Sequence, residues 1–545
     1  MRPTTTIRRT VLAAVLLAVL AACGGGGAGP DAPPPSPPPT LPAVDTSAVA
    51  TADPGSALAV GWHHGAMMEI FVRSYQDSDG DGIGDLQGLI ARLDHLQSLG
   101  VRGIWLMPVT RSQDGDHGYA VSDYRAVETA YGSLADMDAL VAQAHARGIG
   151  VIVDYVMNHS AARNPLFVNA SASGTNPYRD WYVWQSPAPT GWSVYGGDPW
   201  RASATGSYYA PFWDQMPDFN LVNTAVVEYH KNNLRFWLNR GVDGFRFDAV
   251  GNLVENGPAA WENQPRNYTL MAEMRTLLDG YAQRHMVCEG PADPRGFGAA
   301  CGSAFAFDLR RNLVQAALGS AGAIAAVADY FKTAQAGMAT MLSNHDSFAG
   351  QRLWDQLSGN LAQYKLAAAA YLLLPGTPFI YYGEEIGMAG AASLSGDTRL
   401  RTPMSWTANT TTGGFTSATP YRALAANVGA QNVAAQASDP NSLLAFYKAM
   451  LALRNARPSI AQGSYEAAFA SNQVLGYQRS RGAERSLVVI NFGTTAAADV
   501  AVAGLPANAA LTSLFPADGS TANADAGGMA GLTIPAQSVR VFAVN

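Results

Sequence analysis

The chain has 545 residues, a formal net charge of -7 and a pI near 5.7. This length exceeds that of one ordinary domain, so we expect a large core with accessory domains. The acidic balance and the lack of a basic tract argue against a protein that binds nucleic acid or an anionic lipid surface.

The N-terminus has the pattern of an export signal. Two arginines precede an apolar run over residues 11–20, which is too short to span a bilayer. The run ends in "LAAC", which resembles the bacterial lipobox. We therefore predict a signal peptide over residues 1–22 and lipidation of Cys23, although an ordinary signal peptide that happens to contain a cysteine is the alternative. The protein would be exported and anchored to a bacterial membrane through lipid alone, in the periplasm or at the cell surface.

Residues 23–60 begin with a run of glycine and proline, "GGGGAGPDAPPPSPPPTLP". This composition predicts a flexible, partly polyproline tether between the anchor and the folded body. The chain has two other cysteines, Cys288 and Cys301. In an oxidising compartment they could form a disulfide, but two buried free thiols are an equally good interpretation.

From residue 67 onward, apolar runs that predict strands alternate with helical patterns. The run "MMEIFV" is followed by a leucine stripe over residues 86–99, which predicts a helix that ends at Gly100. "GIWLMPV" is the next strand, and Ser133 stands at a good N-cap position before a second helical stripe. The strand "GVIVDYV" follows. This order is typical of β-α-β units.

Five further strands are predicted: "DGFRFDAV", "HMVCEG", "AFAFDL", "ATMLSNHD" and "PFIYYGEE". Helical segments such as residues 226–239 and 361–374 precede most of them. Eight apolar strands alternating with helices favour an α/β fold, a closed (β/α)8 TIM barrel, over an open doubly wound sheet. We assign the catalytic barrel to residues 61–155 and 224–462.

Two segments depart from this alternation. Residues 156–223 show little periodicity and are rich in Trp, Tyr, Gly and Pro, which predicts a subdomain inserted after the third strand. From residue 463 to 545, short strands are separated by turn signals, which predicts a C-terminal all-β domain, a β-sandwich.

Acidic residues stand at the ends of four predicted barrel strands: Asp154, Asp248, Glu289 and Asp346. Any one of them could be a helix cap or a surface charge. Four in succession indicate a site, because the chemistry of such barrels takes place at the carboxyl ends of the strands.

Converging carboxylates suit glycosidic chemistry, which needs an ionised carboxylate on one face of the sugar and a protonated carboxyl aimed at the leaving oxygen. Arg246 lies two residues before Asp248 and therefore on the same strand face, so we expect it to keep that Asp ionised. Glu289 follows apolar residues, and desolvation should raise its pKa and keep it protonated. The aromatic residues of the insert would supply flat faces for sugars.

Five stretches occur in an order similar to that of the signature regions of glycoside hydrolase family 13, the α-amylase family: "DYVMNH", "MPDFNL", "GFRFDAV", the Glu of "CEG" and "LSNHD". The resemblance implies a retaining hydrolase that cleaves α-1,4-glucosidic bonds of starch, glycogen or maltooligosaccharides. It implies that Asp248 is the nucleophile, Glu289 the general acid/base and Asp346 the transition-state stabiliser. We expect an α-glucan or maltooligosaccharide as the partner, contact with a membrane only through the lipid anchor, no nucleic acid, and a monomer.

The same resemblance implies substrate-binding roles for seven further residues: Asp116, His117, Tyr119, Asp154, His159, Arg246 and His345. The second signature region departs from the amylase form, since Gly251 and Asn252 stand where Lys and His are usual. The His of that form helps to hold a second calcium, so we do not predict one.

Three alternatives stay open. Asp116 and "RTPMSW" at residues 401–406 resemble α-glucosidases, so an exo-acting α-glucosidase is one alternative. A transglycosylase is another, because water and a sugar hydroxyl compete for one covalent intermediate. From a different class, the chain could be a surface glycan-binding lipoprotein without catalysis, although the three intact carboxylates argue against it.

The stretch "DSDGDGIGDLQG" at residues 77–88 fits the first half of an EF-hand loop, but Gly88 stands where that loop needs a bidentate Glu. A similar loop follows the first barrel strand in many members of the α-amylase family and holds a structural calcium. The resemblance implies Ca²⁺ bound by Asp77, Asp79, Asp81, Asp85 and the Ile83 carbonyl. An acidic turn without a metal is the alternative.

Overall fold

The structure, a computed structural model, describes residues 41–545 of the chain. The predicted signal peptide, Cys23 and the first part of the tether lie outside the described residues. Residues 42–545 form one compact unit.

The second part of the predicted tether belongs to this compact unit. The Val49 N–H donates to Asn232 Oδ1 (2.9 Å), and the Ala52 N–H donates to Asn239 Oδ1 (3.0 Å). The Arg125 guanidinium donates to the hydroxyl of Ser47. A flexible tether that runs to residue 60 is therefore wrong for this stretch. Its composition could not indicate this, because Val49 and Asn232 stand 183 positions apart.

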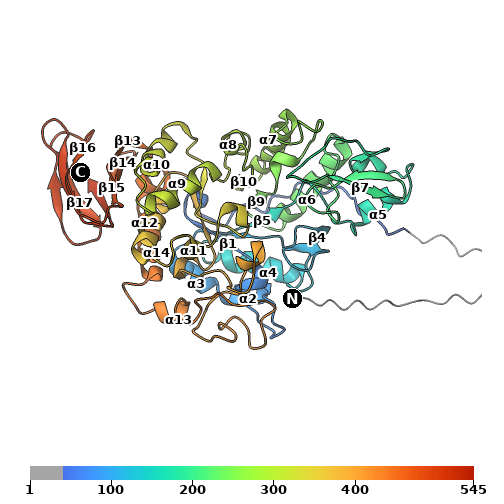
Figure 1. The fold of residues 1–545 in the computed structure, drawn as a ribbon, viewed down its shortest axis with the longest axis horizontal. Helices are drawn as coiled ribbons and strands as arrows, with labels where there is room; N and C mark the ends of the chain where they lie inside the picture. The colour runs from blue at the N-terminus through green and yellow to red at the C-terminus, as the bar shows by residue number, and fades with distance from the viewer. Residues whose placement is uncertain (1–40) are drawn as a thin grey trace, which may run out of the picture. The chain divides into compact units, whose positions relative to one another are not determined.

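A parallel sheet forms the centre of the molecule, with the strand order β10-β9-β5-β2-β1-β12-β11. Its strands are β1 (Met67–Ile70), β2 (Gly103–Leu106), β5 (Gly150–Tyr155), β9 (Gly244–Phe247), β10 (His285–Cys288), β11 (Ala339–Thr340) and β12 (Thr377–Tyr381). Between β10 and β11, Ala304 pairs in parallel with Cys288, and Phe305 pairs with Ala339. These bridges close the ring, so the predicted (β/α)8 barrel is confirmed (Figure 1).

The stretch "AFAFDL" is not the full strand that its apolar pattern predicts. Only Ala304 and Phe305 pair with neighbouring strands, and α9 (Phe307–Ala317) begins two residues later. The buried residues of α9 include Leu309 and Leu313, which are spaced for a helix. A short apolar run of this kind fits a strand or the start of a helix equally well.

Helices cover the outside of the barrel (Figure 1). They include α2 (Leu86–Ala91), α3 (Leu93–Leu99), α4 (Leu134–His145), α6 (Thr224–Asn239), α7 (Pro265–Asp279), α8 (Pro294–Cys301), α10 (Ala321–Thr333), α12 (Leu361–Leu372) and α14 (Leu443–Ala456). The predicted cap of α4 is confirmed, since Ser133 forms a capping box with Asp136. The leucine stripe over residues 86–99 forms two helices rather than one, because Arg92 leaves the helical conformation at φ -106° and ψ 2°.

The segment after β5 forms a small subdomain, as predicted. It contains α5 (Pro165–Ala172) and an antiparallel sheet of β6 (Trp184–Gln185), β8 (Gly206–Tyr209) and β7 (Trp200–Ser203). Aromatic rings hold it together: Phe167 stacks on Trp184, and their centroids are 5.5 Å apart. The aromatic residues of the insert thus form part of its own core.

The C-terminal strands form an all-β region, which is drawn in red in Figure 1. A six-stranded antiparallel sheet has the order β13-β14-β15-β20-β17-β18, and β16 pairs with β19 in a second sheet. The strands are β13 (Glu466–Ser471), β14 (Val474–Arg481), β15 (Glu484–Asn491), β16 (Ala497–Val502), β17 (Ala510–Phe515), β18 (Thr521–Asn523), β19 (Ala530–Ile534) and β20 (Ser538–Val544). The region contacts the barrel through α10, where the Tyr465 hydroxyl donates to Ala328 O (3.1 Å).

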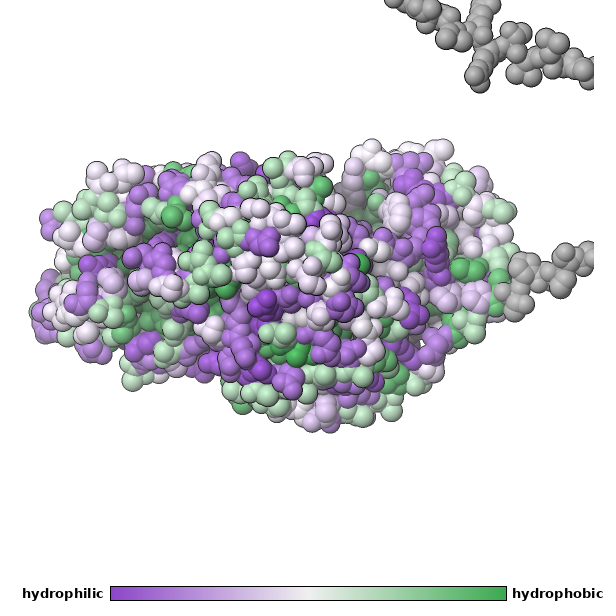
Figure 2. Space-filling view, turned by 90° about the horizontal axis from the view of Figure 1, so that it is seen from below, coloured by the Kyte–Doolittle hydropathy of each residue, from purple (hydrophilic) through white to green (hydrophobic). Residues whose placement is uncertain are grey.

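Two further features concern the cysteines and the relation to a membrane. Cys288 and Cys301 are joined by a disulfide, which links the end of β10 to the end of α8. Among the helices of residues 41–545, none combines the length and apolarity needed to cross a membrane. On the face drawn in Figure 2, hydrophilic and hydrophobic residues are interspersed.

Candidate active site

A cavity of about 370 Å³ lies at the carboxyl ends of the barrel strands. Asp248 follows β9, Glu289 follows β10 and Asp346 stands on the loop after β11. The cavity is lined by these three carboxylates together with His117, Tyr119, His159, Phe212, Trp213, Met216, Ala249, Phe348, Asp397 and Arg401. The structure thus brings together three acidic side chains from distant parts of the sequence.

One buried guanidinium binds three of the predicted site carboxylates. Arg246 Nη1 lies 2.8 Å from Asp154 Oδ1 and 2.5 Å from Asp248 Oδ1. Arg246 Nη2 lies 2.8 Å from Glu289 Oε2. Charge-assisted hydrogen bonds of this kind are strong and directional, so Arg246 holds all three acids around one point.

Close pairing of β9 and β10 places these groups. Gly244 pairs with His285 and Arg246 pairs with Val287 in the parallel register. Gly244 has φ 146°, and a Cβ there would lie 1.8 Å from His285 O. Only glycine therefore lets the two strands approach at this position.

Burial sets the protonation of the two central acids. Burial raises the pKa of Asp248 to about 6, although the ion pair with Arg246 lowers it. The pKa of Asp248 therefore stays below 7 although burial and the Asp154 carboxylate raise it, and Asp248 is ionised at neutral pH. Burial also raises the pKa of Glu289 to about 7, which is the predicted direction. Asp248 thus gives up its proton at a lower pH than Glu289.

Asp346 has the opposite environment. Its burial would raise its pKa, but His345 and Arg401 outweigh this and lower it. His345 Nε2 lies 3.1 Å from Asp346 Oδ2, and His345 Nδ1 lies 2.6 Å from Glu69 Oε1. Burial alone would lower the pKa of His345, yet these two carboxylates raise it to about 10. Asp346 is therefore ionised and faces a charged imidazolium.

Tyr119 and Asp154 form the floor of the site. The Tyr119 hydroxyl donates to Asp154 Oδ2 (2.9 Å) and lies 2.8 Å from His345 Nε2. The rings of Tyr119 and His345 are stacked, with centroids 5.5 Å apart. The indole of Trp105 also donates to Asp154. Together these contacts fix the orientation of the network beneath the cavity.

Two histidines complete the polar lining. His117 and His159 both line the cavity. Burial lowers the pKa of His159 to about 3, so its ring is neutral. His159 Nε2 is buried without a hydrogen-bond partner among the described residues. It is therefore available to a hydroxyl group of a ligand.

Asp116 is placed differently from the other predicted residues. Its carboxylate forms an ion pair with Arg422 (2.6 Å), and it is not among the residues that line the cavity. Sequence reasoning missed two members of the network, Glu69 and Arg401. An acidic residue inside the apolar run "MMEIFV" was the available signal for Glu69.

The acidic loop has a compact centre. Carboxylate oxygens of Asp77, Asp79 and Asp85 lie within 4.8 Å of one another. Asp81 does not belong to this group, and its carboxylate accepts a hydrogen bond from the Ile83 N–H (2.7 Å). Three neighbouring carboxylates suit a hard cation that prefers oxygen ligands. The residues present therefore fit a calcium ion, with the Asp81 carboxylate outside the central group.

A known protein family matches the part of the chain that contains this site. The model of the α-amylase catalytic domain matches residues 69–463. The chain belongs to the α-amylase family. It is therefore a glycoside hydrolase of a family that acts on α-glucans with retention of configuration.

Of three similar proteins, one is named a probable α-glucosidase and two are named α-amylases. The chain is 33% identical over 500 residues to a probable α-glucosidase of Rhizobium meliloti, which covers 80% of this chain and 90% of that protein. It is 33% identical over 445 residues to α-amylase 3 of Dictyoglomus thermophilum, with 79% and 85% covered. The crystal structure of an α-amylase from H. orenii matches with a TM-score of 0.76 and 33% identity, over 89% of this chain and 100% of that one. These likenesses do not distinguish an amylase from a glucosidase.

Proposed function

We propose that this enzyme cleaves α-1,4-glucosidic bonds of starch, glycogen or maltooligosaccharides through a covalent glucosyl-enzyme intermediate. The main support is that Arg246 contacts Asp154, Asp248 and Glu289 at once, and that Asp248 and Glu289 line one cavity. A carboxylate nucleophile and a protonated carboxyl beside it are what a retaining glycosidase needs.

The proposed roles follow from protonation. Asp248, ionised, attacks the anomeric carbon and forms an ester bond while the bond to the leaving oxygen breaks. Glu289, protonated, gives its proton to that oxygen. In the second step Glu289 takes a proton from water, the water attacks the anomeric carbon, and Asp248 is released. Asp346 stays ionised and stabilises the positive charge that develops on the sugar ring.

The remaining polar residues would bind the sugar at the point of cleavage. His117, His159 and Tyr119 line the cavity and can contact its hydroxyl groups or its ring. Asp154 and His345 lie beneath Tyr119 and hold it in place. Asp116 would act at the edge of the site, where Arg422 now binds it.

An exo-acting α-glucosidase, or a transglycosylase on the same residues, is the second candidate. One observation favours it: Arg401 of the "RTPMSW" segment lines the cavity and binds both Asp346 (2.8 Å) and Asp397 (3.4 Å). One side of the cavity is thus lined by ion-paired residues, which would suit the end of a glucan chain. The name of the Rhizobium relative agrees with this alternative.

Three further parts of the proposal concern the whole chain. Ca²⁺ would bind at Asp77, Asp79 and Asp85 and stabilise the loop after β1. Lipidation of Cys23 would anchor the exported protein to a bacterial membrane, on the basis of the sequence pattern at residues 20–23. We expect a monomer.

Incubation with soluble starch, maltotriose and p-nitrophenyl α-glucoside tests the proposed reaction. Mixed oligosaccharides from starch indicate endo action, and glucose alone indicates exo action. Asp248→Asn should lower kcat/KM by at least about three orders of magnitude, the scale expected for loss of a covalent nucleophile. No turnover of any substrate by the wild type would favour a glycan-binding protein instead.

A further inference from the structure

Exposed aromatic residues are concentrated at one place on the surface. Among residues 41–545, the aromatic side chains classed as exposed are Tyr195, Phe212, Trp213 and Phe348. Phe212, Trp213 and Phe348 line the active-site cavity, and Tyr195 packs against Phe212 with centroids 5.7 Å apart. Exposed apolar area that gathers beside a polar cavity marks a binding surface.

Tyr195 stands in a backbone conformation that tyrosine disfavours. Its φ is 50°, and that of Gly196 is 85°. Val194 and Gly197 exchange two backbone hydrogen bonds across this turn (2.8 and 2.9 Å). Positive φ at both central residues is the type I′ geometry, which Asn and Gly adopt most easily. A bulky exposed residue that is held there points to a function other than folding.

The tip of this turn is fixed next to Phe212 of the cavity lining. The Tyr195 hydroxyl donates to Asn252 Oδ1 (3.0 Å), and its ring meets Trp261 edge to face at 5.0 Å. Phe212 in turn packs against the ring of His159 at 5.5 Å. Tyr195 is therefore a preorganised aromatic surface although its side chain is 61% exposed.

The Tyr195 surface lies on the same side of the cavity as Glu289. Asn252 belongs to the turn after Asp248, and two backbone groups of that turn bind Glu289. The Ala249 N–H donates to Glu289 Oε2 (3.0 Å), and the Val250 N–H donates to Glu289 O (3.1 Å). A general acid stands beside the leaving oxygen, so this side receives the part of the substrate that departs.

We propose that Tyr195 and Phe212 form the binding surface for the glucosyl units on the leaving-group side of the scissile bond. This inference rests on the proposed glycosidase function and adds to it the residues that select substrate length. The flat apolar faces of glucosyl rings would stack on the two aromatic rings. Asn252, at the position where amylases have the His of their second signature region, would hold Tyr195 in place as a positioning residue.

Two substrates separate this role from the chemistry of cleavage. Maltopentaose places glucosyl units on the leaving-group side, whereas α-glucosyl fluoride releases only fluoride and cannot touch the aromatic surface. Tyr195→Asn removes the ring but keeps a residue that accepts positive φ. We expect it to lower kcat/KM for maltopentaose about tenfold, mainly through KM, because a stacking contact is lost. The rate with α-glucosyl fluoride should stay within about twofold.

Matched variants sharpen the result. Phe212→Ala should also lower kcat/KM for maltopentaose, and Tyr195→Phe, which keeps the ring, should show a smaller loss than Tyr195→Asn. Met529→Ala removes an exposed apolar side chain of the C-terminal region and should leave the rates with both substrates unchanged. The thermal midpoint of Tyr195→Asn should equal or exceed that of the wild type, since the strained residue is replaced.

Four outcomes decide the matter. Wild-type kcat/KM for maltopentaose in Tyr195→Asn would overturn the inference, as would an equal loss with both substrates, which indicates a structural role. A wild type that cleaves neither substrate would instead overturn the proposed function. Selective loss with maltopentaose and a thermal midpoint no lower than that of the wild type would support the inference.

Discussion

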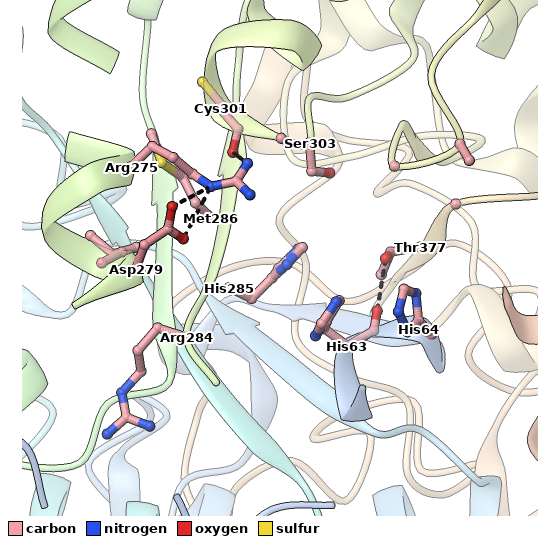
Figure 3. A pocket seen from close by; sticks show the side chains of 15 residues that line it. His63, His64, Arg275, Asp279, Arg284, His285, Met286, Cys301, Ser303 and Thr377 are labelled. Carbon is pink, nitrogen blue, oxygen red and sulfur yellow. Dashed lines mark hydrogen bonds and ion pairs between the residues drawn. The ribbon is translucent and has the colours of Figure 1, made fainter. Parts of the chain in front are cut away.

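The barrel has a cavity at each end, and the two differ in how their buried charges are arranged. The cavity at the carboxyl ends is lined by Asp248 and Glu289, which both pair with Arg246, and by Asp346, which pairs with Arg401. The cavity at the amino ends, about 230 Å³, is lined by three histidines, His63, His64 and His285, and by Arg275 (Figure 3). Residues at the starts of β10 and β12 contribute to it.

Histidines in the amino-end cavity have shifted pKa values but lack opposite charges. Burial lowers the pKa of His63 to about 4 and holds that of His285 well below its usual range, and Arg275 acts in the same direction. Asp279 is bound to Arg275 rather than to a histidine (Figure 3). His63 Nδ1 and His285 Nε2 have no hydrogen-bond partner among the described residues. These rings are neutral at pH 7.

Perturbed pKa values therefore occur at both ends of the same barrel, and they do not by themselves identify a catalytic site. At the carboxyl end one cation is shared among several acids, so that one acid can be ionised while its neighbour is protonated. At the amino end, burial leaves the three histidines neutral. The arrangement of opposite charges, rather than burial, distinguishes the two cavities.

The largest expected effect separates the two cavities directly. Glu289→Gln should lower kcat/KM for maltotriose by about three orders of magnitude, because the leaving oxygen loses its proton donor. His285→Gln should leave kcat/KM within about twofold of the wild type. Initial rates of reducing-end release measure both. A comparable loss in the two variants would remove the distinction between the cavities.

Replacement of Arg246 tests whether its contacts with several carboxylates are needed for activity. Arg246→Lys keeps the charge but cannot contact three carboxylates at once, and we expect a loss of about two orders of magnitude in kcat/KM. The pKa of Asp248 should rise further, so the acid limb of the pH profile should move to higher pH. An unchanged profile with near wild-type activity would show that the guanidinium has no such role.

The pH dependence of the wild type follows from the two raised pKa values. Asp248 must be ionised, so kcat/KM should rise as the pH passes about 6. Glu289 must be protonated, so kcat/KM should fall as the pH passes about 7. The two apparent values belong to the coupled pair, and the optimum should lie between them. His285→Gln should leave both limbs in place, whereas a maximum below pH 5 would contradict the account.

The smallest expected effect concerns the acidic loop, which lies outside both cavities. A chelator should lower the thermal midpoint of the wild type by a few degrees, about the shift expected when a bound ion stabilises the folded state. Asp77→Asn should start from the lower midpoint and show no response to the chelator. Equal midpoints of the wild type with and without chelator would favour an acidic turn without a metal.

The sequence predicted the site better than the details of the strands. Asp248 and Glu289 could be located because each follows a recognisable strand, and strand ends of a barrel share one edge. The β9 strand was predicted correctly from "DGFRFDAV", but the strand predicted at "AFAFDL" was too long. Only Ala304 and Phe305 pair there, because the closure of the ring sets their partners, Cys288 and Ala339. Local pattern does not contain that information.

Long-range partners account for most of what was missed. The pairing of Asp116 with Arg422 joins residues 306 positions apart, and His345 reaches Glu69 over 276 positions. The packing of residues 42–56 on the barrel is of the same kind. No periodicity or motif indicates such contacts, because they depend on how the finished elements lie against one another.

Direct trapping of the intermediate tests the central claim. In Glu289→Gln, α-glucosyl fluoride should still react with Asp248, because fluoride leaves without a proton, but water attack should be slow without the general base. Mass spectrometry of a protease digest should then show one glucosyl group attached to the peptide that contains Asp248. A glucosyl group on another residue, or none under conditions where the variant consumes the fluoride, would contradict the account.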